Sequence, residues 1–234
     1  MTREPNDPTR AGSPVPADGT VLLSRNEVEA LCSKAARGSG MTWGHAEEAG
    51  GAVGWLHAQG IDGAAALLGV LETMAGRQVM PVVAPGHWVS DGGGPLCPVA
   101  TGAALCDFRD LPEGQLGGVG LSLGTVSHPV ILLPFLSEIA QHLGTGVEMN
   151  WDGGSVRVHP QGQCVGDVAR LAGQPVATVT LTLVGTDTHP SFAGGAKPCD
   201  GIALARLNDL ALRTTVPPSE RSRADAGAGT SDND

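Results

Sequence analysis

Four residues whose side chains can bind ligands or move protons lie close together in the sequence: Trp43, His45, Glu47 and Glu48. The spacing predicts a helix on which Trp43 and Glu47 share a face, while Glu47 and Glu48 point about 100° apart. We expect Trp43 to contact a ligand and Glu47, packed near it, to act as a general acid or base. The alternative is that both carboxylates only interact favourably with the helix macrodipole.

A glycine-rich segment, GHWVSDGGGPLCP, places His87, Asp91 and Cys97 around three consecutive glycines. A backbone of this kind can approach a ligand closely, so we expect His87 and Asp91 to bind one. A cysteine nucleophile needs a nearby base, and Cys97 and His128 are therefore candidate catalytic residues, together with Glu47 and Glu48. An inert buried cysteine is the alternative interpretation of Cys97.

Sequence signals for cofactors and metals are missing. The glycine-rich segment lacks the G-x-x-x-x-G-K-[ST] spacing of a phosphate loop, and LGGVGLSLG has no clear strand before it and no helix after it, as a dinucleotide site requires. The five cysteines contain no C-x-x-C pair, and no H-x-x-x-H or H-E-x-x-H spacing occurs. We therefore expect no cofactor and no bound metal.

The charge balance excludes several classes of partner. The chain carries 24 acidic and 14 basic residues, a formal net charge of −10, which disfavours nucleic acid and anionic membrane surfaces. The longest apolar stretch, residues 130–136, is far shorter than the roughly 20 residues that span a bilayer. Unpaired cysteines and the absence of an apolar leader at the start indicate a cytoplasmic protein.

Three helices are predicted in residues 21–75. Ser24 and Glu27 form a capping box at the start of the first, Thr42 caps a second over about residues 43–58, and Asp62 caps a third that reaches about residue 75. The second helix contains three glycines that each cost up to ~1 kcal/mol of helix propensity. We expect these glycines, Gly50, Gly51 and Gly54, to pack closely against another backbone.

Residues 76–213 are predicted to form a sheet with additional helices in the same globule. The clearest signals are a strand over 126–133 leading into a helix to residue 143, a hairpin of 147–151 and 155–159, an alternating strand over 175–184, and helices near 165–171 and 202–212. Only short strands and loops are predicted over 76–124. Residues 1–20 and 214–234 are expected to be disordered.

The predicted fold class is thus α+β, with an N-terminal three-helix unit packed on a mixed or antiparallel sheet and two or three further helices. No repeat at a fixed period is present.

Four segments carry a resemblance to a known family: LSRNEVEALCSKAARGSG, WGHAEEAGGAVGWLHAQGIDG, GPLCPVATGAAL and HPVILLPFL. Together they resemble the bacterial domain-of-unknown-function family 3726 (DUF3726), over about Leu22 to Leu212. His45 stands where an apolar residue is expected, so no family role is assigned to it. The resemblance implies a cytoplasmic protein that accompanies dehydrogenases of the malate, lactate or ureidoglycolate type and other enzymes of small-molecule metabolism.

Two hypotheses from different classes follow. In the first, the chain is an accessory or small-molecule-binding protein that acts with a metabolic enzyme, such as an oxidoreductase, on a small amino or hydroxy acid. In the second, it is a cofactor-free hydrolase, isomerase or cyclase that uses Glu47 or Glu48 with Cys97 or His128, in a cleft between the helical unit and the sheet.

Overall fold

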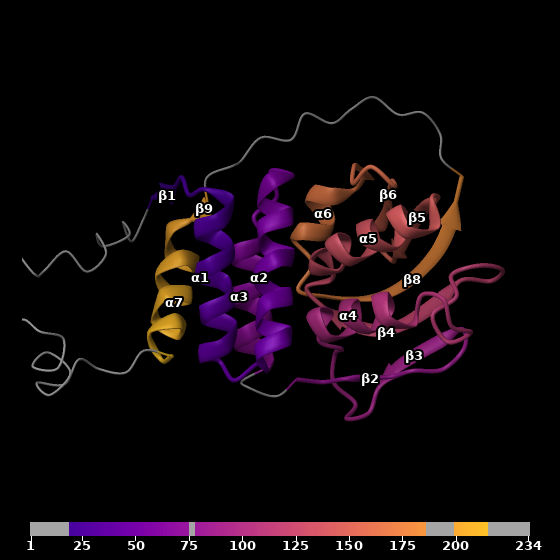
Figure 1. Ribbon diagram of the computed structural model, residues 1–234, viewed down its shortest axis with the longest axis horizontal. Helices are drawn as coiled ribbons and strands as arrows, with labels where there is room; N and C mark the ends of the chain where they lie inside the picture. Colours follow the sequence, from indigo (N-terminus) through magenta and orange to yellow (C-terminus); the bar gives the residue numbers. More distant parts are fainter. Residues whose placement is uncertain (1–18, 75–77, 186–198, 215–234) are drawn as a thin grey trace, which may run out of the picture.

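The computed structural model describes residues 19–74, 78–185 and 199–214 of the 234-residue chain. In these ranges, seven α-helices and one 3-10 helix accompany nine strands (Figure 1). The helices are α1 (Arg25–Gly38), α2 (Trp43–Ala58), α3 (Gly63–Met74), α4 (Pro98–Phe108), η1 (Pro129–Leu132), α5 (Leu133–Leu143), α6 (Val168–Ala172) and α7 (Gly201–Leu212). The strands are β1 (Thr20–Val21), β2 (Pro81–Val82), β3 (His87–Ser90), β4 (Leu121–Ser127), β5 (Gly146–Trp151), β6 (Gly154–Val158), β7 (Cys164–Gly166), β8 (Val176–Val184) and β9 (Cys199–Asp200).

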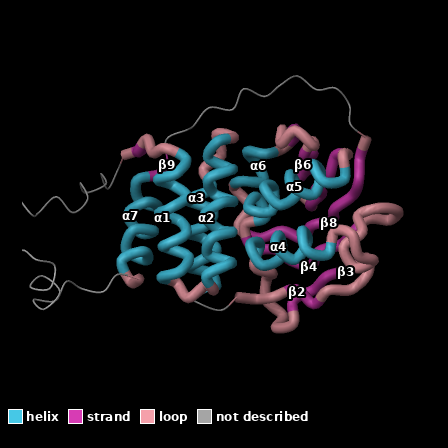
Figure 2. The backbone as a smooth tube through the Cα atoms, viewed as in Figure 1, coloured by secondary structure: helices cyan, strands magenta, loops and turns pink. Residues whose placement is uncertain are grey.

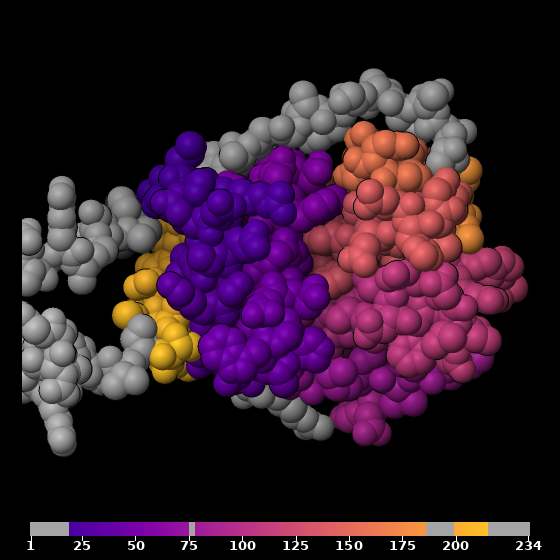
Figure 3. Space-filling view, in the orientation of Figure 1, coloured from indigo at the N-terminus to yellow at the C-terminus, as the bar shows by residue number. Residues whose placement is uncertain are grey.

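Four helices, α1, α2, α3 and α7, pack together as a helical unit (Figure 2). The predicted capping box starts α1, because the N–H of Glu27 donates to Ser24 Oγ while the Glu27 carboxylate accepts from the N–H of Ser24. Strands β1 and β9 pair antiparallel directly before α1 and α7, which therefore begin side by side. Figure 3 shows α7 along the outer edge of α1. The last helix thus packs with the helical unit, although its sequence position placed it in the sheet portion.

Close backbone contact joins α1 to α2. A Cβ atom on Gly50 would lie 1.9 Å from Ser33 Oγ and 2.7 Å from the carbonyl oxygen of Glu29, and one on Gly54 would lie 2.8 Å from the Glu29 carboxylate. Gly51 faces open space, with nothing within 4 Å of the same position. The predicted close packing against another backbone is confirmed for Gly50. Gly54 packs instead against the side chains of Glu29 and Arg25, and the prediction is wrong for Gly51.

The larger sheet has the strand order β2-β3-β4-β8-β5-β6-β7. Strands β3 and β4 pair parallel and the other neighbours pair antiparallel, so the sheet is mixed. Its central strand, β8, is the segment with the clearest alternation in the sequence. The predicted hairpin forms from β5 and β6, with Trp151 opposite Gly154. The predicted α+β class is confirmed, with four α-helices beyond the first three.

Helices α4 and α5 lie together beside the sheet (Figure 1). A Cβ atom on Gly102 of α4 would lie 2.2 Å from the ring of Phe135 on α5, so glycine allows this contact. One face of the sheet is buried against these helices, as the fully buried side chains of Trp88, Leu123 and Met149 show. Helix α2 contacts α4 and α5, and α3 contacts η1, so the core continues from the helical unit into the sheet portion.

Two local predictions are wrong. Residues 126–133 are not one strand, because β4 ends at Ser127 and η1 follows at once. His128 between them takes a left-handed conformation with φ 42° and ψ 62°, which breaks the extended run. Residues 76–124 contain a full helix, α4, in which Val99, Thr101 and Gly102 lower the helix propensity that its three alanines supply. Burial against α5 stabilises it where propensity does not.

Residues 1–18 of the predicted arm and 215–234 of the predicted tail lie outside the described residues, and Thr20 belongs to β1. Among the helices that the structure describes, none combines the length and apolar character needed to cross a membrane.

Candidate functional site

A groove of about 170 Å³ opens where the end of α1 meets the start of α2. Its aromatic residue is Trp43, with 68% of its surface accessible. Indole side chains are usually well buried, so an exposed one points to a binding surface. The short connection between the helices places the last turns of α1 beside the first turns of α2. The groove is lined by Ser33, Lys34, Arg37, Trp43, Ala46, Glu47 and Thr214.

The indole of Trp43 is held by a cation. Cζ of Arg37 lies 4.8 Å from the centroid of the Trp43 ring, within the range of a cation–π interaction. The same guanidinium donates through Nη1 to the backbone carbonyl of Met41 in the connecting loop. These two contacts hold the Arg37 guanidinium in place, and Arg37 in turn holds the Trp43 ring that lines the groove.

The groove combines two cations, one carboxylate and one aromatic ring. Lys34 and Arg37 come from the end of α1, and Glu47 follows Trp43 by one turn of α2, as predicted. The three charged side chains give the groove a formal charge of +1, within a chain of net charge −10. The surface that these residues present to the groove is mainly apolar, so the groove itself can receive the apolar part of a small molecule beside Trp43.

Glu48 does not line this groove, and the charges that act on it include Asp107 of α4 and Glu138 of α5. Burial raises the pKa of Glu48, and the charges of Glu138, Asp107 and Glu47 raise it further, while His45 opposes them. The acidic pair is therefore divided between two surfaces, as the predicted 100° separation requires. Neither residue lies in the first turn of α2, so the macrodipole affects them only weakly.

We predict that Glu48→Gln stabilises the protein at about pH 7, by on the order of a few tenths of a kcal/mol because the side chain is largely exposed. A carboxyl pKa that is raised in the folded state makes stability fall as pH rises from the ordinary value through the raised one. Glu48→Gln removes this loss of stability. Its gain in the free energy of unfolding over the native protein should therefore vanish at about pH 3, where the native carboxyl is protonated. Urea unfolding at both pH values measures this, and an advantage that persists at pH 3 would contradict it.

Cys97 is fully buried at the N-cap position of α4 and not in an open glycine-rich loop. Burial raises the pKa of the Cys97 thiol, against the opposing effects of the Ala100 and Val99 N–H groups and the Gln78 side chain. Nε2 of Gln78 lies 2.9 Å from Nδ1 of His45, so Gln78 connects α2 to the start of α4. A buried thiol with a raised pKa fits the inert interpretation.

His128 lies between the sheet and the helical unit. It is the only non-glycine residue with positive φ in the described part of the chain, and Nδ1 lies 2.9 Å from Oγ of the buried Ser127. Its ring faces Gly69 of α3, where a Cβ atom would lie 2.2 Å from Nε2. Burial lowers the pKa of His128, which keeps the imidazole neutral at physiological pH.

His87 and Asp91 lie elsewhere. His87 is exposed on β3, opposite Ser122 of β4, and Asp91 is exposed in the turn that follows β3. Figure 1 places β3 in the sheet portion, away from α1. Of the seven predicted site residues, Trp43 and Glu47 thus line the same groove.

Sequence reasoning missed the basic side of the groove. Lys34 and Arg37 lie in the first predicted helix, where no motif marks them, and Thr214 lies at the far end of the described chain. The available signal was the short helix–loop–helix connection, since it brings the last turn of α1 against Trp43. Thr214 could not have been found, because only tertiary packing brings α7 to α1.

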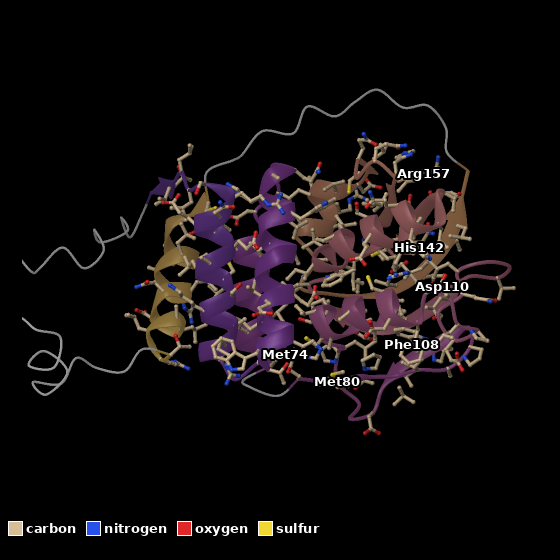
Figure 4. The ribbon with its side chains drawn as sticks, in the orientation of Figure 1. Met74, Met80, Phe108, Asp110, His142 and Arg157 are labelled. Carbon is tan, nitrogen blue, oxygen red and sulfur yellow. The ribbon has the colours of Figure 1, made fainter. Side chains whose placement is uncertain are left out.

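Ionisable side chains also meet at the outer end of α4 and α5. Nε2 of His142 lies 3.0 Å from Oδ1 of Asp110, near Phe108 (Figure 4). Arg109 donates to the carbonyl of Cys106 and lies 3.5 Å from the Glu138 carboxylate. Across the described ranges, no group of three or more His, Cys, Asp or Glu residues is arranged to hold a metal ion.

A family model described as "Protein of unknown function (DUF3726)" matches residues 23–95. The predicted resemblance is confirmed over this stretch, which contains α1 to α3, β2 and β3 and so includes most of the groove. The stretch is shorter than the expected extent to Leu212. No curated protein matches the chain.

Proposed function

We propose that this chain, whose residues 23–95 are the DUF3726 family segment, binds a small amino or hydroxy acid in the groove between α1 and α2 and acts as an accessory protein to a metabolic enzyme. The observation that carries the proposal is the exposed indole of Trp43, held over the Arg37 guanidinium beside Lys34 and Glu47. An aromatic ring with fixed charges around it is the composition of a small-molecule site.

The size of the groove supports a ligand of this class. Its volume of about 170 Å³ is below the roughly 300–1,000 Å³ of sites for drug-sized molecules, so the occupant is a single small metabolite. The lining of the groove is mainly apolar, and we propose that the basic groups of Lys34 and Arg37 bind a carboxylate beside it, since guanidinium and ammonium groups are the usual carboxylate partners.

The partner enzyme and the compartment are further parts of the proposal. We propose a cytoplasmic oxidoreductase or related enzyme of small-molecule metabolism, on the basis of the family resemblance. The open position of Trp43 on the helical unit leaves a bound ligand accessible to such a partner. Purification of the tagged protein from its native cells, followed by mass spectrometry, should recover one enzyme in stoichiometric amount.

Ligand binding is tested by thermal unfolding with a panel of amino acids and 2-hydroxy acids. A ligand that binds only the folded state raises the unfolding temperature by mass action. We expect at least one member to do so for the native protein, and Trp43→Ala to abolish the shift while leaving the unliganded protein folded, because its ring is exposed. Val119→Ala is the matched control, since Val119 is 94% exposed and distant in sequence.

Two outcomes would overturn the proposal. One is that no acid in the panel shifts the unfolding temperature. The other is that the shift is the same for the native protein and Trp43→Ala, which would place the ligand outside the groove.

A cofactor-free enzyme is the second candidate, and one observation favours it. Glu48 has a raised pKa and lies near His45, a pairing that suits acid–base chemistry. Cys97 and His128 belong to other regions, so this candidate depends on Glu48 alone among the predicted catalytic residues. Loss of substrate turnover in Glu48→Gln, with the ligand-induced thermal shift retained, would favour the enzyme over the accessory protein.

A further inference from the structure

We infer that the protein forms a two-fold symmetric dimer through the exposed face of α7. Figure 1 shows this helix at the outer edge of the helical unit, away from the sheet. The surface includes neither Trp43 nor Glu47, so the inference goes beyond the proposed function and does not depend on a ligand in the groove between α1 and α2.

Four exposed residues form one stripe along α7: Ile202, Arg206, Asp209 and Arg213. Arg213 is the C-cap residue, and its backbone is still helical. Successive members are four, three and four residues apart, so all of them lie on one face of the helix. The stripe has an apolar end, because 56% of the Ile202 surface is accessible, and a charged end.

The spacing of the stripe is the same in both directions along the helix. A second copy of α7 can therefore run antiparallel to the first, with the two-fold axis midway between Arg206 and Asp209. Arg206 then faces Asp209 of the second copy, and Asp209 faces Arg206 of the second copy. A two-fold interface forms every contact twice, so one acid and one base on each copy pair completely.

The charges on this face are available for that pairing. Nη2 of Arg206 lies 2.6 Å from Oε1 of Glu72 on α3. A guanidinium has five N–H donors, so Arg206 can bind a second carboxylate and keep the first. No ion pair among the described residues involves Asp209, whose exposed carboxylate can therefore bind Arg206 of the second copy.

A hollow of about 350 Å³ lies between α3 and α7, beside the charged end of the stripe. The antiparallel arrangement places Ile202 of the second copy opposite Arg213, at this hollow, where it can pack against Leu210 and the arginine stem. Each copy thus offers one protruding apolar side chain and one hollow. Polar and apolar atoms line the hollow in about equal measure, and the lining residues are Leu68, Leu71, Glu72, Arg206, Asp209, Leu210 and Arg213.

The charge balance of the surface favours a second copy over a strongly acidic or basic partner. Glu72 and Asp209 balance Arg206 and Arg213, so the formal charge of the surface is zero. The whole chain carries −10, and two copies repel one another where that charge is concentrated. A neutral face whose acid and base pair with their own copies is a place where two chains can approach.

Sedimentation velocity of the full chain over a range of concentrations tests the inference. The native protein should show a reversible equilibrium between monomer and dimer. Arg206→Asp and Asp209→Arg each put like charges at both contacts, so either should weaken the dimer roughly tenfold or more. Asp152→Arg makes the same charge change in the exposed β5–β6 turn, and this control should leave the dimer unchanged.

Mixing the two variants gives the sharper measurement. In a heterodimer of Arg206→Asp with Asp209→Arg, both contacts again join one acid to one base. The mixture should therefore recover most of the dimer that each variant alone has lost. Asp209→Arg keeps the pair between Arg206 and Glu72, so it tests the surface even if Arg206→Asp is unstable. Circular dichroism checks that each variant is folded.

Three outcomes would overturn the inference. The first is a native chain that sediments as a monomer at every concentration. The second is a folded Asp209→Arg variant that dimerises as well as the native protein, which would place the interface elsewhere. The third is a mixture of two folded variants that stays monomeric. The thermal shift produced by acids reports on the groove and should be the same for these variants, so the proposed function is tested separately.

Discussion

Gly50→Ala should lower the free energy of unfolding by about 2–3 kcal/mol, the upper range for overpacking a close contact. The added methyl group would lie 2.7 Å from the carbonyl oxygen of Glu29 and 1.9 Å from Ser33 Oγ. The hydroxyl can rotate away but the carbonyl belongs to the α1 backbone, so α1 and α2 must separate. Urea unfolding monitored by circular dichroism measures the loss.

Gly51→Ala is the matched control in the same helix. The added methyl group meets nothing within 4 Å, and alanine is favoured over glycine inside a helix by up to ~1 kcal/mol. We therefore expect this variant to be more stable than the native protein. Equal effects of the two substitutions would show that helix propensity, and not the contact with α1, determines the role of Gly50. The same separation of helices should disturb the groove, so Gly50→Ala should also weaken ligand binding.

Gly69→Ala should cost about 2 kcal/mol, because the new methyl group would lie 2.2 Å from Nε2 and 2.6 Å from Cε1 of His128. The imidazole cannot easily yield, since Nδ1 contacts Ser127 Oγ at 2.9 Å and the His128 backbone is fixed before η1. The contact joins α3 of the helical unit to the end of β4, so its loss should loosen the two parts of the core. Chemical unfolding of Gly69→Ala and of the native protein measures the loss.

His128→Gly provides the compensating change. It removes the ring and replaces a side-chain residue at φ 42° with the residue that adopts this conformation most readily. On the His128→Gly background, Gly69→Ala should be neutral or stabilising, which gives a coupling energy of about 2 kcal/mol between the two sites. Additive effects would show that His128 and Gly69 do not meet as described.

The helix caps could be predicted from the sequence because helix starts depend on local hydrogen bonds. Ser24 and Glu27 bond each other across three residues, and Thr42 begins α2 at the predicted residue. Strand β8 could be predicted from the sequence because apolar and polar residues alternate over its nine residues, which is the pattern of a half-buried strand. Helix α4 was not predicted, because Val99, Thr101 and Gly102 interrupt its helix-favouring alanines. Contact with α5 adds stability that the local sequence does not show.

The sequence by itself determined the three N-terminal helices, the β5–β6 hairpin, the strand β8, the α+β class and the shared face of Trp43 and Glu47. These features follow from interactions between residues close in the chain. Only the tertiary structure decided that α7 joins α1 and so brings Thr214 to the groove, and that Cys97 is buried at a helix start. Those arrangements depend on which apolar faces meet, and residues far apart in the chain select them through packing that no local pattern encodes.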